Sequence, residues 1–312
     1  MIVRLLASLL IVAAAACAPA SQSSSGRPAV VTAFYPLTWA ASVIGGDDVV
    51  VTNLTGAGAE PHDLELTPGQ VRSLREAALV VLVGGGFQPA VETAATGIPG
   101  PVVDVLELAA VKPALITGSS GEVDGAHGEG PGEQPAGHEE EGRIDPHVWL
   151  DPVLMAEIVR AVGNRLAEVD AAHADEHRSR AEALTARLAE LDRTLASGLA
   201  GCARREFVTS HSAFAYLARR YGLTEVGISG LAPETEPSPQ RLAEVATFAK
   251  ERGVTTIFFE TLVSPRVAES LVREVGVATE VLDPIEGQPE GGDYFVAMER
   301  NMAVLRRGLG CP

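Results

Sequence analysis

Short apolar segments alternate along the chain with stretches in which apolar residues recur every three or four positions. Helix-start signals separate several of these segments, such as Thr67-Pro68, where threonine can cap a helix and proline can occupy its first turn. This alternation predicts an α/β fold with mostly parallel sheets and helices on both faces. The apolar segments rich in β-branched residues predict strands at 30–34, 48–54, 78–83, 102–106, 206–210, 224–228, 255–259 and 278–282.

The middle of the chain interrupts the alternation. Residues 118–142 contain no Leu, Ile, Phe, Tyr or Trp, and carry His127 and His138 among glycines and acidic residues. Such a segment cannot bury apolar surface, so we expect a disordered acidic loop there. A long helix with leucines at three-to-four spacing is predicted at 174–199. The pattern therefore predicts two α/β lobes, at 28–172 and 201–312, joined by one helix at 173–200.

The N-terminus has the features of an export signal. The run from Leu5 to Ala16 is apolar apart from Ser8, and small residues stand directly before Cys17. This predicts a signal peptide at 1–16, lipidation of Cys17 and a flexible tether at 17–27. The alternative is an ordinary secretion signal in which Cys17 is incidental.

Two cysteines remain once Cys17 is set aside. Disulfides persist in exported proteins, so we expect Cys202 and Cys311 to pair, the alternative being two free thiols.

The charge balance excludes some classes of protein. The chain has 24 Lys and Arg against 41 Asp and Glu, a formal net charge of −17. An acidic surface of this kind repels phosphate backbones, so we expect no nucleic-acid partner. Beyond the N-terminal run, no apolar stretch approaches the ~20 residues that a membrane-spanning helix needs.

Residues that could bind a metal ion lie where predicted strands end. His62, His147, His211 and Asp283 lie at such ends or in the loops after them, where open α/β sheets bind ligands. Three imidazoles and one carboxylate suit a four-coordinate site for a divalent transition metal. Glu60, two residues before His62, is a rival for the carboxylate position.

Four local motifs resemble those of ZnuA/TroA-type metal-binding lipoproteins, the substrate-binding proteins of zinc and manganese ABC importers. The motifs are EPHDLELTP at 60–68, DPHVWLDP at 145–152, SHSAFAYL at 210–217 and LDP at 282–284. The resemblance implies a C-clamp: two lobes joined by one long rigid helix, with the metal held between them. Carried over motif by motif, it implies His62, His147, His211 and Asp283 as ligands.

The resemblance also implies a function. It predicts a monomeric, non-enzymatic protein, lipid-anchored outside the cell membrane, that delivers zinc to the permease and ATPase of an importer. Histidine at the third ligand position, His211, resembles zinc-type members and suits zinc better than manganese. A manganese-binding member and an exported zinc hydrolase are the alternatives, the hydrolase needing an open metal position for water.

For several other residues the sequence leaves the role open. Glu260 could accept a hydrogen bond from a ligand imidazole, or could be an ordinary acid at a strand end. His127 and His138 could gather zinc in the acidic loop. His173 and His177 lie four apart on the long helix, but Ala174 stands where a zinc protease motif needs glutamate, so a solvated helix start is expected.

Overall fold

The structure is a computed structural model that describes residues 26–117, 142–260, 262 and 266–312. The predictions for the signal peptide, for lipidation of Cys17 and for metal capture by His127 and His138 concern positions outside these described residues. The same holds for nearly all of the predicted tether at 17–27 and of the predicted disordered loop at 118–142. Among the helices described, none is long and apolar enough to cross a membrane.

The first lobe is built on a four-stranded parallel sheet in the order β2-β1-β3-β4. Its central strands β1 and β3 are almost entirely buried, which explains their continuous apolar sequences. The strands are β1 (Ala29–Thr32), β2 (Val50–Asn53), β3 (Leu79–Leu82) and β4 (Val102–Asp104). The helical segments beside them are α1 (Tyr35–Gly45), η1 (Gly46–Asp48), α2 (Pro68–Glu76), α3 (Pro89–Ala95), η2 (Val105–Glu107) and η3 (Lys112–Ala114).

The second lobe repeats this plan with a parallel sheet in the order β6-β5-β7-β8. Its strands are β5 (Glu206–Thr209), β6 (Thr224–Gly227), β7 (Thr256–Phe259) and β8 (Ala278–Val281). Its helices are α6 (Ala215–Tyr221), α7 (Pro239–Glu251), α8 (Arg266–Val275) and α9 (Tyr294–Leu309). In each sheet the chain passes from the first strand to one edge and then crosses to the other side. Such a change of direction leaves a crevice at the carboxyl ends of the strands, where open α/β sheets bind ligands.

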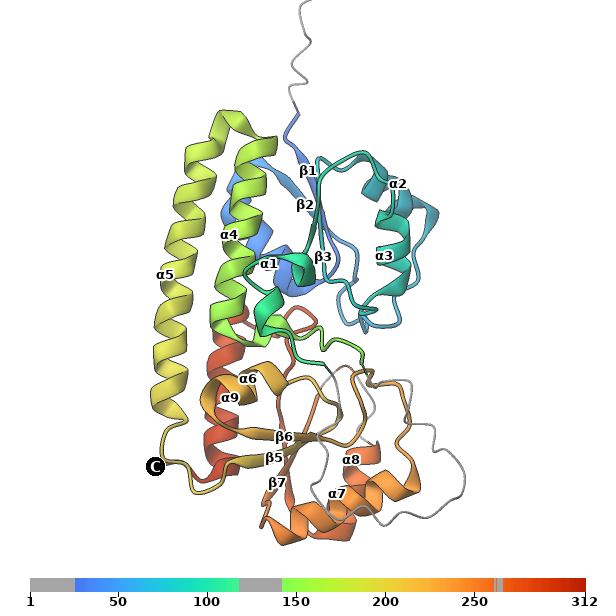
Figure 1. The fold of residues 1–312 in the computed structure, drawn as a ribbon, viewed down its shortest axis with the longest axis vertical. Coiled ribbons are helices and arrows are strands. Elements are labelled where there is room, and N and C mark those ends of the chain that lie inside the picture. Colours follow the sequence, from blue (N-terminus) through green and yellow to red (C-terminus); the bar gives the residue numbers. More distant parts are fainter. Residues whose placement is uncertain (1–25, 118–141, 261, 263–265) are drawn as a thin grey trace, which may run out of the picture.

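Two antiparallel helices connect the lobes along one side of the molecule (Figure 1). After η4 (Val148–Leu150), α4 (Pro152–Val169) runs along the first lobe, η5 (Ala171–His173) turns the chain, and α5 (Ala174–Gly198) returns to the second lobe. The leucines of α5 at positions 184, 188, 191 and 195 are buried. The predicted α/β architecture with a long joining helix is confirmed.

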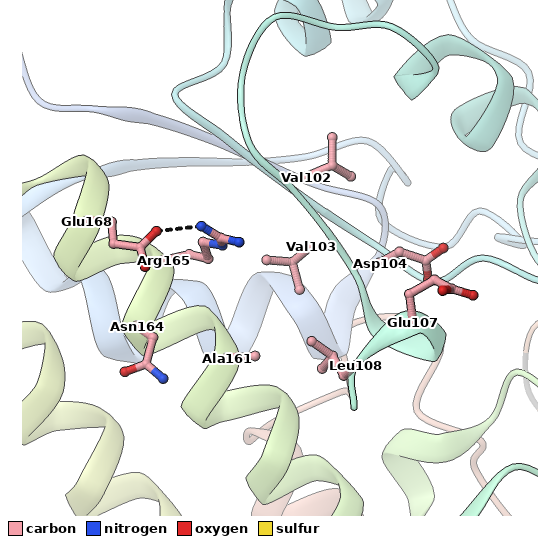
Figure 2. Close-up of a pocket in the computed structure, with 9 residues that line it drawn as sticks. All are labelled: Val102, Val103, Asp104, Glu107, Leu108, Ala161, Asn164, Arg165 and Glu168. Atoms are coloured by element: carbon pink, nitrogen blue, oxygen red, sulfur yellow. Dashed lines mark hydrogen bonds and ion pairs between the residues drawn. The ribbon is translucent and has the colours of Figure 1, made fainter. Parts of the chain in front are cut away.

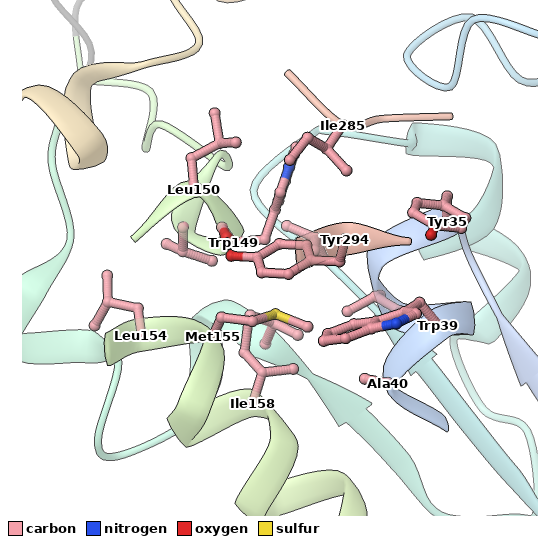
Figure 3. Packing of buried hydrophobic residues seen from close by; sticks show 14 of the residues in the cluster. Tyr35, Trp39, Ala40, Trp149, Leu150, Leu154, Met155, Ile158, Ile285 and Tyr294 are labelled. Atoms are coloured by element: carbon pink, nitrogen blue, oxygen red, sulfur yellow. Dashed lines mark hydrogen bonds between the residues drawn. The ribbon is translucent and has the colours of Figure 1, made fainter. Parts of the chain in front are cut away.

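The larger of two hydrophobic clusters among the described residues extends from the first lobe across the junction into the second, and a smaller cluster lies within the second lobe. At the junction, Trp39 of α1 stacks on Tyr294 of α9 with ring centroids 4.7 Å apart (Figure 3). Trp149 donates its indole N–H to the Pro284 carbonyl at 2.7 Å, and the Tyr294 hydroxyl donates to the Trp149 carbonyl at 2.6 Å. These contacts tie the lobes together independently of the joining helix.

The predicted disulfide between Cys202 and Cys311 is present. It joins positions 109 residues apart and lies beside backbone hydrogen bonds from Ala203 to Gly310 and from Arg204 to Leu309. The two ends of the second lobe are therefore pinned together. On the chain-entropy model, closing a loop of this length stabilises the fold by about 4–5 kcal/mol.

Candidate metal centre

Three histidines and one glutamate converge between the lobes. His62 lies in the loop after β2, His147 directly precedes η4, His211 follows β5 and Glu286 follows β8. One donor atom from each lies within 4.8 Å of all the others. His147, His211 and Glu286 are buried, and the side chain of His62 is only 7% exposed. The fold thus brings four metal-ligating groups from four distant segments to one point.

The spacing of this group, which we call the metal cluster, suits a small tetrahedral cation. Glu286 Oε1 lies 3.4 Å from His62 Nε2, 3.2 Å from His147 Nε2 and 3.8 Å from His211 Nε2. A tetrahedron with metal–ligand bonds of ~2.0–2.1 Å has edges of about 3.3–3.4 Å. The three distances from Glu286 are therefore close to the separation that a zinc-sized ion requires, and all four donors lie within 4.8 Å of one another.

The carboxylate in the cluster is Glu286 and not Asp283, the residue expected from the sequence. Asp283 Oδ1 accepts a hydrogen bond from the Ile285 backbone N–H at 2.7 Å, so this carboxylate closes its own turn. The chain then turns, and Glu286 points to the histidines. The available signal in the sequence was a second acid three residues after Asp283, at position 286.

Glu60, the rival carboxylate, lies beside the cluster. Its Oε2 accepts the His62 backbone N–H at 2.8 Å, while its Oε1 is 4.0 Å from His62 Nε2. Burial, reinforced by the charge of Glu286, raises the pKa of Glu60 to about 9. Glu60 thus orients the His62 loop and is held largely in its neutral form in the metal-free protein.

Two imidazoles of the cluster are oriented by carboxylates on their other nitrogen. His147 Nδ1 lies 2.7 Å from Asp145 Oδ1, and His211 Nδ1 lies 2.6 Å from Glu260 Oε1. Ser210 also donates its hydroxyl to Glu260, at 2.8 Å. Such partners keep the proton on Nδ1 and leave Nε2 to face a metal. Glu260 therefore contacts His211, while Asp145 is a comparable residue that sequence reasoning missed.

The electrostatics of the cluster are those of a cation site. Burial by itself lowers the pKa of His147, but Asp145 and Glu286 outweigh it and raise that pKa to about 10. Glu260 and Glu286 likewise raise the pKa of His211 against the effect of burial. Burial favours the neutral form of Glu286, yet the surrounding histidines lower its pKa. Protons thus balance the carboxylates when no metal is bound, and an incoming cation must displace them.

Two nitrogens of the cluster lack a hydrogen bond. Within the described part of the chain, Nε2 of His147 and Nε2 of His211 are buried and make no hydrogen bond, although Glu286 Oε1 lies 3.2 Å from the first and 3.8 Å from the second. Buried polar atoms in native proteins are almost always satisfied, and exceptions require an explanation. Both atoms face the point that the cluster surrounds, so coordination of a metal ion explains them.

The loop that carries His211 is anchored from the neighbouring strand. The buried carboxylate of Glu225, on β6, accepts hydrogen bonds from the Thr209 hydroxyl at 2.8 Å and from the backbone N–H groups of Ala213 and Phe214 at 3.1 and 3.0 Å. Burial raises the pKa of Glu225 to about 7 although these donors oppose the rise. Glu225 therefore fixes the backbone directly before α6, up to the N-cap residue Phe214.

The helix pair His173 and His177 differs from the expected solvated helix start. His177 is fully buried, with Nδ1 3.2 Å from the Ile44 carbonyl and Nε2 3.0 Å from Asp170 Oδ2. His173 Nδ1 approaches the same Asp170 oxygen at 2.9 Å, and its side chain is 45% exposed. The packing of α5 against the end of α1 buries His177, which the local sequence pattern does not reveal.

A separate hollow of about 450 Å³ lies between β4 and α4 (Figure 2). No histidine or cysteine lines it. Arg165 and Glu168 at its rim pair with each other at 2.5 Å. This hollow has carboxylates in its lining but no imidazole, which supplies three of the four donors of the metal cluster.

A family model described as "Zinc-uptake complex component A periplasmic" matches residues 30–308 of the chain. The chain belongs to this family. The chain is 35% identical over 294 residues to the zinc-binding lipoprotein AdcA of Streptococcus pneumoniae, covering 92% of this chain and 56% of AdcA. It is 33% identical over 297 residues to the high-affinity zinc uptake system protein ZnuA of Bacillus subtilis, covering 93% and 90%.

Solved structures agree with this family membership. The Zn(II)-bound ZnuA-like domain of S. pneumoniae AdcA matches with a TM-score of 0.70 and 30% identity, covering 91% of this chain and 99% of that chain. The periplasmic zinc-binding protein TroA of Treponema pallidum matches with a TM-score of 0.76 and 25% identity, covering 91% and 99%. The chain spans just over half the length of the AdcA relatives, but nearly all of their ZnuA-like domain.

Proposed function

We propose that this chain is the extracytoplasmic zinc-binding component of an ABC-type importer, and that it hands zinc to a membrane permease driven by an ATPase. The observation that carries the proposal is the metal cluster, four convergent donors held between the two lobes. Family membership and the names of the AdcA and ZnuA relatives support the same role.

In this proposal the zinc ligands are His62, His147, His211 and Glu286. Four protein donors complete a tetrahedral site, whereas a catalytic zinc keeps one position open for water. A complete ligand set supports binding and delivery over an exported zinc hydrolase. It also accounts for the burial of the cluster, because a closed site retains its ion until the protein meets its transporter.

The donor set favours zinc over manganese. Imidazole nitrogen suits zinc, while manganese prefers oxygen ligands, and the cluster offers three imidazoles to one carboxylate. We therefore propose zinc as the cargo and keep a manganese-binding role as the alternative that competition must exclude.

The position in the cell envelope follows from the N-terminal pattern. Lipidation of Cys17 would hold the protein, which we propose to be a monomer, on the outer side of the cell membrane beside the permease. Replacing Cys17 by serine tests this: the protein should move from the membrane to the soluble fraction. Unchanged membrane retention would contradict the anchor.

Metal analysis of the purified chain tests the function. We expect one zinc per chain, a zinc affinity that excess manganese does not overcome, and no hydrolysis of ester or peptide substrates. Failure to bind zinc, or preferential binding of manganese, would contradict the zinc-delivery role. A zinc-dependent hydrolase activity abolished by His211→Ala would favour the enzyme instead.

A further inference from the structure

The turn that carries Glu286 has a strained backbone. Ile285, directly before Glu286, has φ = 60° and is the single non-glycine residue with positive φ in the described ranges. A β-branched side chain is a genuine outlier in this left-handed region. Ile285 is also fully buried, in the core at the lobe junction (Figure 3). The chain thus accepts an unfavourable conformation at the residue that aims the only carboxylate of the metal cluster.

Hydrogen bonds from three side chains hold the turn at residues 283–285. Asn301, on α9 and only 2% exposed, accepts the Asp283 N–H on Oδ1 at 2.9 Å and donates from Nδ2 to the Asp283 carbonyl at 2.6 Å. Asp283 in turn accepts the Ile285 N–H at 2.7 Å. Trp149 donates to the Pro284 carbonyl at 2.7 Å. Each residue from 283 to 285 is therefore fixed by at least one side chain.

The double contact of Asn301 has a particular consequence. A side-chain amide that both donates to and accepts from one residue's backbone reproduces the pairing of a neighbouring strand. Asn301 therefore fixes the chain just past the end of β8 and determines where the turn starts. Strained residues persist only where their surroundings over-determine them, and they cluster at functional sites.

We infer that Asn301 is a positioning residue for metal binding. Through its paired hydrogen bonds to Asp283, it holds the strained turn at Ile285 so that Glu286 meets the three imidazoles. Asp283 belongs to the same group of hydrogen-bonded residues. This role explains why Asp283 lies at the strand end although it is not part of the metal cluster. The inference rests on the proposed function, because it assigns the residue that prepares the carboxylate ligand of that same site.

Asn301→Ala, compared with Arg300→Ala, tests the inference. Arg300 is the adjacent residue of α9, and it makes two side-chain hydrogen bonds to the carbonyls of Glu290 and Gly291 in the loop before the helix. Loss of a group that is hydrogen-bonded directly to a metal ligand reduces metal affinity by about 10- to 100-fold. Asn301 contacts Asp283 and not a ligand, so we expect a loss of about tenfold, the lower end of that range, for Asn301→Ala and little change for Arg300→Ala. Urea unfolding of the metal-free proteins establishes that each variant is folded in the assay.

A double-mutant cycle separates positioning from general destabilisation. If Asn301 acts through Glu286, Asn301→Ala should lower zinc affinity in the wild type but not in the Glu286→Gln background. An equal loss in both backgrounds, or no loss in the wild type, would overturn the inference. Absence of zinc binding by the wild type would instead overturn the proposed function, so the two failures are distinguishable.

The strain supplies a further test. Glycine adopts φ near +60° without steric cost. In the Ile285→Gly background the turn needs less support, so Asn301→Ala should reduce zinc affinity less than it does in the wild type. The same loss with isoleucine or glycine at this position would show that strain has no part in positioning Glu286.

Discussion

The metal cluster and the pair His173–His177 combine the same groups, imidazoles and carboxylates, with opposite results. At the start of α5, both nitrogens of His177 face protein acceptors, the Ile44 carbonyl and Asp170. In the cluster, Nδ1 of His147 and Nδ1 of His211 face carboxylates, while their Nε2 atoms have no hydrogen-bond partner in the described chain. A histidine bonded by protein on both sides is structural. A histidine bonded on one side and buried on the other is prepared for a ligand.

The largest expected effect comes from removing a donor of the cluster. Replacing His211 by alanine removes a direct ligand, so it should weaken zinc binding by more than about 100-fold, the upper range for outer contacts. Competition against a fluorescent zinc chelator measures the change. His173→Ala is the matched control, and its zinc affinity should equal that of the wild type. Equal affinities for His211→Ala and the wild type would exclude His211 as a ligand.

The next-largest effect is expected from a carboxylate that contacts a ligand histidine from outside the metal cluster. Glu260→Gln keeps the size of the side chain but removes the charge that orients His211, so zinc affinity should fall by about 10- to 100-fold. The same titration tests this variant. Asp170→Asn, which makes the equivalent change beside His177, should leave zinc affinity unaltered. A similar loss in both variants would mean that the comparison between the two regions does not hold.

Protons should compete with zinc over an unusually high pH range. Because the raised pKa of His147, about 10, keeps it protonated at neutral pH, zinc must displace a proton there. Affinity should therefore rise as the pH rises from 7 towards 10, by about tenfold per pH unit for each proton displaced. Calorimetry in buffers of different ionisation enthalpy measures the released protons. A zinc affinity that is constant above pH 7 would contradict the protonated state of His147.

The last effect concerns the stability supplied by Asp170, and not the affinity for metal. Burial raises its pKa, but hydrogen bonds from His177 and His173 outweigh burial and lower it. A carboxyl with a lowered pKa stabilises the fold above its unfolded pKa of ~3.9, and that stability is lost as the pH falls towards the folded value. The pKa of His173 is raised, chiefly by its hydrogen bond to Asp170, so its contribution is present below ~6.5 and lost as the pH rises through the folded value.

Unfolding experiments on the metal-free protein can measure this contribution. Asp170→Asn should lower the free energy of unfolding by roughly 1–3 kcal/mol at pH 6, because buried His177 loses its charged partner. The difference from the wild type should shrink as the pH falls below 4. A difference that does not depend on pH would show that packing, and not the ionised carboxyl, explains the loss.

The order of strands and helices was predictable because it depends on local patterns. Strand candidates such as 78–83 are continuous apolar runs, and Thr67-Pro68 caps α2 as expected. The three histidines of the cluster were singled out by their positions near strand ends and by their motifs. Tertiary contacts decided the rest: Asn301 and Asp283 form the turn that selects Glu286, and the end of α1 buries His177. Asn301, on α9, and Ile44, at the end of α1, lie on different elements from the residues that they position.

Anomalous diffraction at the zinc edge, from crystals of the protein loaded with one zinc, locates the ion directly. We predict a single strong peak about 2.0–2.2 Å from Nε2 of His62, His147 and His211 and from a carboxylate oxygen of Glu286. Asp283 should remain bonded to the Ile285 backbone N–H. A peak coordinated by Asp283, or zinc bound away from the three imidazoles, would contradict the proposed ligand set.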